Sequence, residues 1–268
     1  MNMRLHSTLP GRLGKRIPAP GHCLLCHLGQ HSFIVKLGTV VIYLDPFLTR
    51  LPGRLVPPLF RPEDATNAAI VTGSHDHGDH IDRPAWPAIA AAAPEAVFVV
   101  PEAVRPTIAE VPSKRLRGLN AGESFSHAGV TITAVPAAHE FLDRDEKTGL
   151  YPYLGYIIQG NGVTIYHSGD TCLYEGMASL LRQWTIDVAI LPINGRDAAR
   201  LRRNCIGNMT YQEAADLAGA IKPRVTIPAH FDMFRGNTAD PREFLAYMAV
   251  KYPNLKTLRP RLGDVNEI

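Results

Sequence analysis

The sequence predicts an α/β fold in which two β-sheets pack face to face and helices cover their outer faces, a four-layer αββα sandwich. Three features of the chain indicate this arrangement. Apolar runs of strand length recur along it, strand hairpins come first in each half, and strands then alternate with helices. With 268 residues, 46% of them hydrophobic, the chain is long enough to bury the core of such a sandwich.

The first half begins with a predicted hairpin that turns at Gly38. A loop rich in proline and arginine follows at 48–66, and an alanine-rich helix is expected to start at Pro84 and to end before Pro94. The strands expected in this half are 32–37, 39–44, 68–73 and 97–100, and the helices are 84–93 and 102–110.

The second half repeats this pattern, with two hairpins before the alternation of strands and helices. Gly160-Asn161-Gly162 is a turn sequence, Thr210 and Glu213 form a capping box, and Asp240-Pro241 begins the last helix. The expected elements are hairpins at 124–137 and 154–170, helices at 173–184 and 210–222, and strands at 187–193 and 225–230.

We expect one domain over residues 23–268, because no linker divides this stretch. Residues 1–22 contain three prolines and several basic side chains and are predicted to form a loose N-terminal arm. Cys23 and Cys26 form a C-x-x-C without the second pair that a structural zinc site usually needs, so we assign this stretch to the lead-in of the first strand.

Composition excludes several classes of protein. The net charge of +3 is too small to indicate a nucleic-acid partner, and four cysteines are too few for a disulfide scaffold. No apolar segment has the length of a membrane span or of a signal peptide, so a cytoplasmic location is expected. A homo-oligomer remains open.

The segment from Ser74 to Asp82 indicates chemistry, because three histidines and three aspartates fall within nine residues. Imidazole and carboxylate are ligands of zinc, iron and manganese. His75 and His77 are two residues apart at the end of a strand and can bind one ion. Asp79 and His80 lie at the following turn and can reach a second ion. A packed core would not hold so many adjacent polar side chains, since each would need a buried partner.

Three more candidate ligands stand where predicted strands end: His139, Asp170 and His230. Each alone would be unremarkable as a site. Together with the first cluster they complete two ligand sets on one edge of the sheets, where α/β folds place their sites.

The pattern H-x-H-x-D-H, then a lone histidine, an aspartate and a final histidine, resembles the metallo-β-lactamase superfamily and its fold. The resemblance extends from about Leu28 to Phe244. The segments HSGDT at 167–171 and IPAHFD at 227–232, and the His-Ile-Asp at 80–82, are similar to the branch of L-ascorbate-6-phosphate lactonases. That lactonase has no histidine at the place of His139 and carries longer segments, so the substrate need not be the same.

The resemblance implies two divalent metal ions, zinc or manganese, with iron as a further option. The implied ligands of one ion are His75, His77 and His139, those of the other are Asp79, His80 and His230, and Asp170 bridges the two. Asp170 and Asp79 are the implied catalytic residues. Two ions that share a water lower its pKa, so that hydroxide is available near neutral pH.

Aspartates near the ligands are candidates for orienting the histidines by hydrogen bonds: Asp45, Asp76 and Asp82. Asp45 is equally explained as a turn residue at a strand end. After the strand at 187–193, Asn194 and Arg196 are candidate substrate-binding residues, because a guanidinium clamps phosphate or carboxylate groups. A solvated basic surface or a subunit contact is the alternative for the neighbouring arginines.

The predicted function is hydrolysis by a lactonase or carboxylic-ester hydrolase that acts on a small anionic substrate such as a sugar-phosphate lactone. A phosphodiesterase of the phospholipase-D type uses the same metal core and is the main alternative. A diiron redox flavoprotein would need a glutamate where His77 stands and a flavin domain. A β-lactamase would be exported, and a non-catalytic metal-binding protein would be expected to lose ligands.

Overall fold

The computed structural model describes residues 9–268, in which two seven-stranded sheets pack against each other. In the first sheet the strands follow the order β14-β1-β2-β3-β4-β5-β6, and in the second β13-β12-β11-β10-β9-β8-β7. The first sheet contains β1 (Leu24–Gly29), β2 (Ser32–Leu37), β3 (Val40–Leu44), β4 (Ile70–Thr72), β5 (Val97–Pro101), β6 (Leu116–Leu119) and β14 (Val265–Glu267). The second contains β7 (Ser124–His127), β8 (Val130–Pro136), β9 (Leu154–Gly160), β10 (Val163–His167), β11 (Val188–Pro192), β12 (Val225–Ala229) and β13 (Lys256–Thr257).

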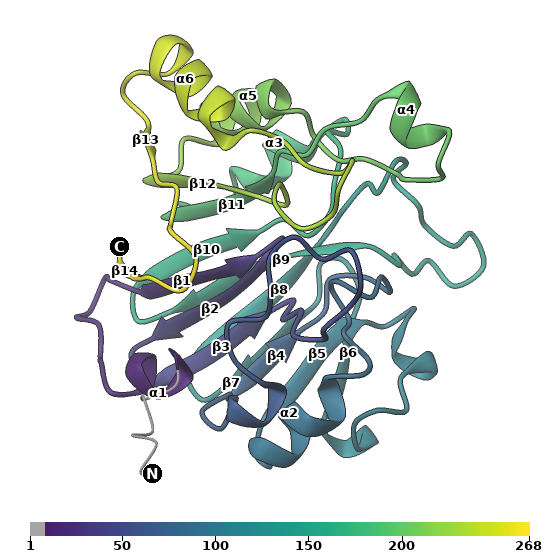
Figure 1. Ribbon diagram of the computed structural model, residues 1–268, viewed down its shortest axis with the longest axis vertical. Coiled ribbons are helices and arrows are strands. Elements are labelled where there is room, and N and C mark those ends of the chain that lie inside the picture. The colour runs from purple at the N-terminus through teal and green to yellow at the C-terminus, as the bar shows by residue number, and fades with distance from the viewer. Residues whose placement is uncertain (1–8) are drawn as a thin grey trace.

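Helices cover both outer faces, which confirms the four-layer αββα sandwich. The helices are α1 (Leu9–Gly14), α2 (Trp86–Ala92), α3 (Met177–Leu181), α4 (Ala198–Leu201), α5 (Tyr211–Ile221) and α6 (Pro241–Lys251). In Figure 1, α1 and α2 lie at one end of the molecule and α3, α5 and α6 at the other, while α4 projects from the body on a loop. One apolar cluster fills the space between the sheets, and two more pack α1 with α2, and α3 with α5 and α6, onto the outer faces.

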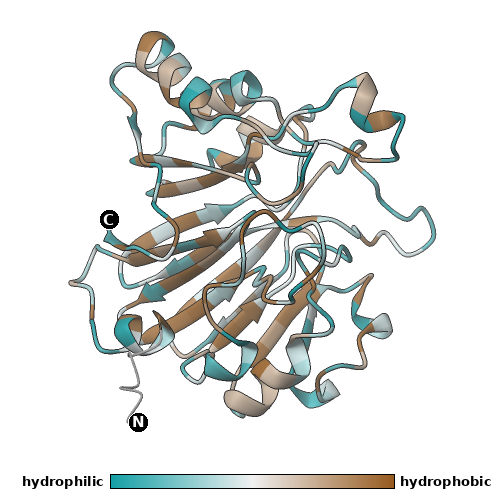
Figure 2. Cartoon of the chain, in the orientation of Figure 1, coloured by the Kyte–Doolittle hydropathy of each residue, from teal (hydrophilic) through white to brown (hydrophobic). Residues whose placement is uncertain are grey.

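The apolar runs that predicted the strands are buried. All residues of β2, β3, β11 and β12 are buried, as expected for strands that contact an apolar layer on both faces. Figure 2 shows the same distribution, with hydrophobic strands and hydrophilic loops. The burial of these strands explains why continuous apolar runs, rather than strict alternation, mark them in the sequence.

Parallel pairing brings several strand ends to one edge of the molecule. In the first sheet β3, β4, β5 and β6 are parallel, and in the second β10, β11 and β12 are parallel. β8 is antiparallel to β9, which is antiparallel to β10, so β8 runs in the same direction as β10. The loops that follow β4, β8, β10, β11 and β12 therefore leave from carboxyl ends, where α/β sheets place their sites.

Most predicted elements are confirmed, and the exceptions are short. The capping box of Thr210 and Glu213 begins α5, and Asp240 caps α6. The helix expected at 102–110 is wrong, because only the 3-10 turn Arg105–Thr107 forms there. Pro106 stands within this turn and has no N–H to donate to a longer helix. The short strands β1, β6, β13 and β14 were not predicted, since segments of two to six residues give little periodicity.

The prediction of a loose N-terminal arm is corrected for the part of the arm that the structure describes. Residues 1–8 of the predicted arm lie outside the described residues, whereas Leu9–Gly14 form α1. Leu13 is fully buried in the outer apolar cluster, and Gly14 O accepts a hydrogen bond from Lys36 Nζ at 2.7 Å. Within residues 9–268, the helices are all too short or too polar to traverse a bilayer.

Candidate metal centre

Five loops at the carboxyl ends of strands carry the predicted site residues. His75, His77, Asp79 and His80 follow β4, and His139 follows β8. Asp170 follows β10, Asn194 follows β11 and His230 follows β12. The fold brings the seven predicted ligands together, and three overlapping groups of them have ligand atoms close enough to hold a metal ion.

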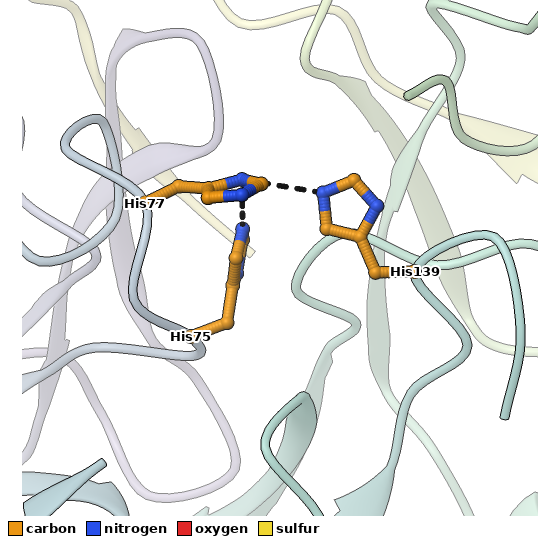
Figure 3. Close-up of side chains that lie close together, drawn as sticks. All are labelled: His75, His77 and His139. Carbon is orange, nitrogen blue, oxygen red and sulfur yellow. Dashed lines mark hydrogen bonds between the residues drawn. The ribbon is translucent and has the colours of Figure 1, made fainter. Parts of the chain in front are cut away.

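The first ligand set consists of three imidazoles: His75, His77 and His139. His77 Nδ1 lies 3.0 Å from His75 Nε2 and 3.3 Å from His139 Nε2. Figure 3 shows the three rings converging on one point from two loops far apart in the sequence. Two nitrogens that bind one zinc ion in tetrahedral geometry are about 3.3 Å apart, so these spacings suit a single ion.

The second ligand set consists of Asp79, His80 and His230. Asp79 Oδ2 lies 3.6 Å from His80 Nε2 and 3.7 Å from His230 Nε2. The two imidazole rings are stacked, with centroids 5.6 Å apart and an interplanar angle of 13°. This set includes a carboxylate, so it is more negative than the first.

Asp170 lies between the two sets, as the resemblance implied for a bridging ligand. Its Oδ2 is 3.1 Å from His230 Nε2 and 3.7 Å from His139 Nε2, and its Oδ1 is 3.3 Å from His80 Nε2. One carboxylate therefore reaches histidines of both sets.

The charges of the cluster shift its pKa values strongly. Burial alone would lower the pKa of His80, but the carboxylates of Asp170 and Asp79 outweigh it and hold that pKa well above its ordinary value. Burial alone would raise the pKa of Asp170, but His230 and His80 hold it well below the ordinary range. In the first set burial dominates and lowers the pKa of His75 and of His139, the latter to about 4. A cation is thus favoured among the carboxylates.

The donor atoms fit a divalent metal ion. His80 Nε2 and Asp170 Oδ1 are buried and have no hydrogen-bond partner among the described residues, although buried polar atoms are normally paired. His80 Nδ1 lies 2.7 Å from Asp45 Oδ2, so in the neutral form of the ring, the form that binds a metal, the proton belongs on Nδ1 and Nε2 faces Asp170 with a free lone pair. A metal ion would satisfy both unpaired atoms, and imidazole with carboxylate is a donor set for zinc, manganese or iron.

Of the three aspartates predicted to orient the histidines, the structure places one against a ligand. Asp45 is fully buried and holds His80, and its Oδ2 accepts a hydrogen bond of 2.5 Å from Ser74 Oγ. Asp76 is exposed and forms an ion pair with Arg83 at 2.8 Å. The Asp76 carboxylate thus contacts Arg83 and not a histidine ligand, so its predicted role in orienting the histidines is wrong.

Asp82 is buried but braces a loop, so the predicted contact with a histidine is wrong here too. It accepts hydrogen bonds from the backbone N–H groups of Leu48 and Thr49, both at 2.7 Å, and one from the Thr49 hydroxyl. These contacts tie the loop after β3 to the ligand-bearing loop after β4. Asp82 therefore stabilises the surroundings of the site.

Gln30 is a site residue that the sequence reasoning missed. Its Nε2 donates to Asp79 Oδ2 at 2.8 Å and lies 3.0 Å from His230 Nε2, and its backbone carbonyl accepts from the His230 N–H at 2.7 Å. Its backbone is left-handed, with φ of 56°. The signal was a polar side chain directly after Gly29, at the end of β1. Tyr153 also packs here, with its ring centroid 5.2 Å from that of His139.

The two predicted substrate-binding residues are both engaged with neighbouring side chains. Both terminal nitrogens of Arg196 donate to the carboxylate of Glu213 at 2.6 Å. Asn194 is buried and joins two loops, since it donates to Asn237 at 2.9 Å and accepts from Asn208 at 3.1 Å. A substrate anion at Arg196 would therefore compete with Glu213.

A cavity of about 310 Å³, here called the side cavity, lies beside the ligand His139. Its lining comes from the loops after β8 and β10 and from the segment around α4, and consists of Glu140, Phe141, Cys172, Arg196, Asp197, Leu201, Cys205, Ile206 and Gly207. Glu140 directly follows His139, and Cys172 is two residues beyond Asp170.

Comparison with known proteins agrees with this site. The sequence profile of the Beta-lactamase superfamily domain matches residues 41–231, which include all seven candidate ligands. The fold and the His/Asp cluster thus define a metal-dependent hydrolase of the metallo-β-lactamase superfamily.

The similarity to curated relatives is more specific. A UPF0173 metal-dependent hydrolase of Pyrococcus horikoshii is 32% identical over 219 residues, which are 81% of this chain and 88% of that protein. One of Pelotomaculum thermopropionicum is 31% identical over 238 residues, 87% of this chain and 95% of that protein. The chain belongs to the UPF0173 family of metal-dependent hydrolases.

Solved structures show the same fold. Igni18, a metallo hydrolase from the archaeon Ignicoccus hospitalis, superposes with a TM-score of 0.72 at 24% identity. The superposition covers 92% of this chain and 98% of Igni18. An isothiocyanate hydrolase from Delia radicum gut bacteria gives 0.69 at 16% identity, with 91% and 98% covered. The expected kinship with ascorbate-phosphate lactonases stays a prediction.

Proposed function

We propose that this hydrolase binds two divalent ions and cleaves a carboxylic ester, most simply a lactone, in an uncharged small substrate. The position of Asp170 between the two ligand sets supports two ions, because its oxygens lie 3.1 Å from His230 and 3.7 Å from His139. Zinc or manganese suits this donor set best. When bound, such ions activate a water and withdraw charge from the oxygen of the scissile group.

The side chains of this site have definite parts in that reaction. Asp170 carries a negative charge, since its pKa is held well below the ordinary range, and its Oδ1 can accept a hydrogen bond from the attacking water. Asp45 fixes the ring of His80 from behind, and Gln30 fixes the carboxylate of Asp79.

The charge of the side cavity favours an ester over a phosphodiester. Among the described residues of the lining, Arg196 is the only cation and pairs with Glu213, Asp197 pairs with Arg200, and Glu140 is acidic. Apart from the metal ions, a phosphodiester would find no unpaired cation among the described residues of this lining, and Glu140 would repel it. The expectation of an anionic substrate at Arg196 is accordingly replaced by that of an uncharged one, and the phosphodiesterase becomes the outcome that would refute the proposal.

A direct comparison of two substrates tests this function. The protein, purified without chelator and supplied with zinc or manganese, is offered an aryl ester and an aryl phosphodiester with the same leaving group, together with a neutral lactone. We expect a higher kcat/KM for the ester and the lactone, and none with Asp170→Ala. Faster cleavage of the phosphodiester by the same preparation would refute the ester assignment.

A further inference from the structure

Exposed apolar side chains gather around the side cavity. Phe141 is 67% exposed and Leu201 is 60% exposed, and both belong to its lining. Inside, Cys172, Cys205 and Ile206 line the walls. Apolar surface gathered on a rim of polar loops marks a place where an apolar group binds.

The two loops that carry His139 and Asp170 also contribute part of the lining of this cavity. The Cys172 N–H donates to the Ala138 carbonyl at 2.7 Å, and the Ala138 N–H donates to the Thr171 hydroxyl at 3.0 Å. These bonds clamp the loop that carries His139 to the loop that carries Asp170. These two loops supply Glu140, Phe141 and Cys172 to the lining, and the segment that includes α4, which projects from the body in Figure 1, supplies the rest.

Among the described residues that line the cavity, no cation is left unpaired for an anionic substrate. Arg196 pairs with Glu213 at 2.6 Å, and Asp197 pairs with Arg200. The remaining charge in the lining is Glu140, an exposed carboxylate that would repel an anion. Apolar contact is what these walls offer a ligand.

We propose that the side cavity binds a short hydrocarbon substituent of the ester or lactone, and so selects alkyl-substituted substrates over sugar-like polar ones. This rests on the proposed ester hydrolysis at the neighbouring ligands. A volume of about 310 Å³ is at the lower end for ligand pockets, so the substituent is a small alkyl or aryl group. Its binding removes apolar surface of Phe141 and Leu201 from water, which is favourable in proportion to the area covered.

The test uses a homologous series of alkyl hydroxamates, whose head groups bind metal ions, with chains from methyl to octyl. Calorimetry on the zinc-loaded protein should show affinity that rises by up to about fourfold per methylene until the cavity is full. Phe141→Ser and Leu201→Ser should flatten that slope. Val250→Ser, which changes a side chain 85% exposed on α6, is the matched control and should keep it.

The outcomes separate this proposal from the proposed function. An affinity that does not rise with chain length, or no binding of any hydroxamate, overturns the hydrocarbon site even if esters are hydrolysed. A rising affinity with no turnover of any ester or lactone keeps the site and refutes the ester hydrolysis. A wild-type dimer that becomes monomeric in Leu201→Ser would assign these apolar side chains to a contact between two copies and overturn the proposal.

Discussion

The two ligand sets share one edge of the sandwich but differ in charge and in support. The first set has three imidazoles and no carboxylate of its own, and His77 is exposed. The second contains Asp79, and its two histidines are buried. The second set is also held from behind, because Asp45 lies 2.7 Å from His80 and the Gln30 carbonyl accepts from His230 at 2.7 Å.

This difference predicts an order of metal binding. A negative and braced set attracts an ion strongly and loses little freedom when it binds one. A set of neutral imidazoles with one exposed member attracts the ion less and loses more freedom. We therefore expect the set of Asp79, His80 and His230 to bind its ion more tightly. The backbone agrees, since Asp45, Gln30 and His230 all have left-handed φ values, of 43°, 56° and 57°, which surrounding contacts must maintain.

The largest effect is expected from the residue that the two sets share. Asp170→Ala removes the carboxylate that reaches His230, His80 and His139, so both sets lose a partner at once. Turnover should fall by roughly several orders of magnitude, given the size of metal-assisted terms. The circular dichroism spectrum should stay unchanged because the residue lies beyond a strand end. Near-normal kcat would show that the two sets act independently of Asp170.

Acid should separate the two sets in the metal-free protein. Burial lowers the pKa of His75 and that of His139, to about 4, so their contribution to stability is present above about pH 6.5 and is lost as the pH falls toward 4. His139 alone accounts for about 3 kcal/mol. His80 has the opposite sign, because its raised pKa gives a contribution that is full below about pH 6.5 and lost as the pH rises through the folded value.

Thermal unfolding of the metal-free protein from pH 7.5 to 4 and histidine NMR measure this difference. We expect the Tm to fall with acid, as the buried neutral histidines must take up protons on unfolding. His80 should already be protonated at a pH where His139 is neutral. A His80 resonance that titrates below that of His139 would contradict the electrostatic contrast.

Removing support from one set should weaken one binding step. Asp45→Asn keeps the shape of the side chain but removes the charge that holds His80, and should lower the affinity of the tighter step about 10- to 100-fold. Asp76→Asn is the matched control for the tighter step, since Asp76 pairs with Arg83 at the surface, and it should leave that step unchanged. Equal losses in the two variants would mean that Asp45 acts only through general charge.

The smallest effect is expected at Gln30. Gln30→Leu removes the donor to Asp79 while it keeps a similar volume, and should weaken the tighter step by roughly tenfold, the lower end for partners of ligands. The looser step should keep its affinity, because Gln30 has no hydrogen bond to His75, His77 or His139 among the described residues. A change confined to the looser step, measured by calorimetry, would reverse the assignment.

The sequence was sufficient to predict the layers and the seven candidate ligands. Apolar runs gave the strands, and the carboxyl ends of parallel strands gave the place where His139, Asp170 and His230 meet. It could not distinguish Asp45 from Asp76 and Asp82, because the direction of a side chain depends on local backbone angles and on distant partners.

Long-range contacts explain the other gaps. Gln30 meets His230 across 200 residues, which no local pattern reveals. Arg196 was predicted to bind an anion. Glu213, however, both completes the capping box with Thr210 and forms an ion pair with Arg196. Glu213 was recognised as a cap from the sequence, and only the fold shows that it also neutralises Arg196.

A calorimetric titration of the metal-free protein with zinc tests most directly the central claim, that two unequal ligand sets each bind one ion. We predict two ions per chain in two steps, with the tighter step lost in Asp79→Ala and the looser step lost in His77→Ala. Elemental analysis of the saturated and desalted protein should give close to two ions. One ion per chain at saturation, or loss of the tighter step in His77→Ala, would contradict the account of two unequal ligand sets.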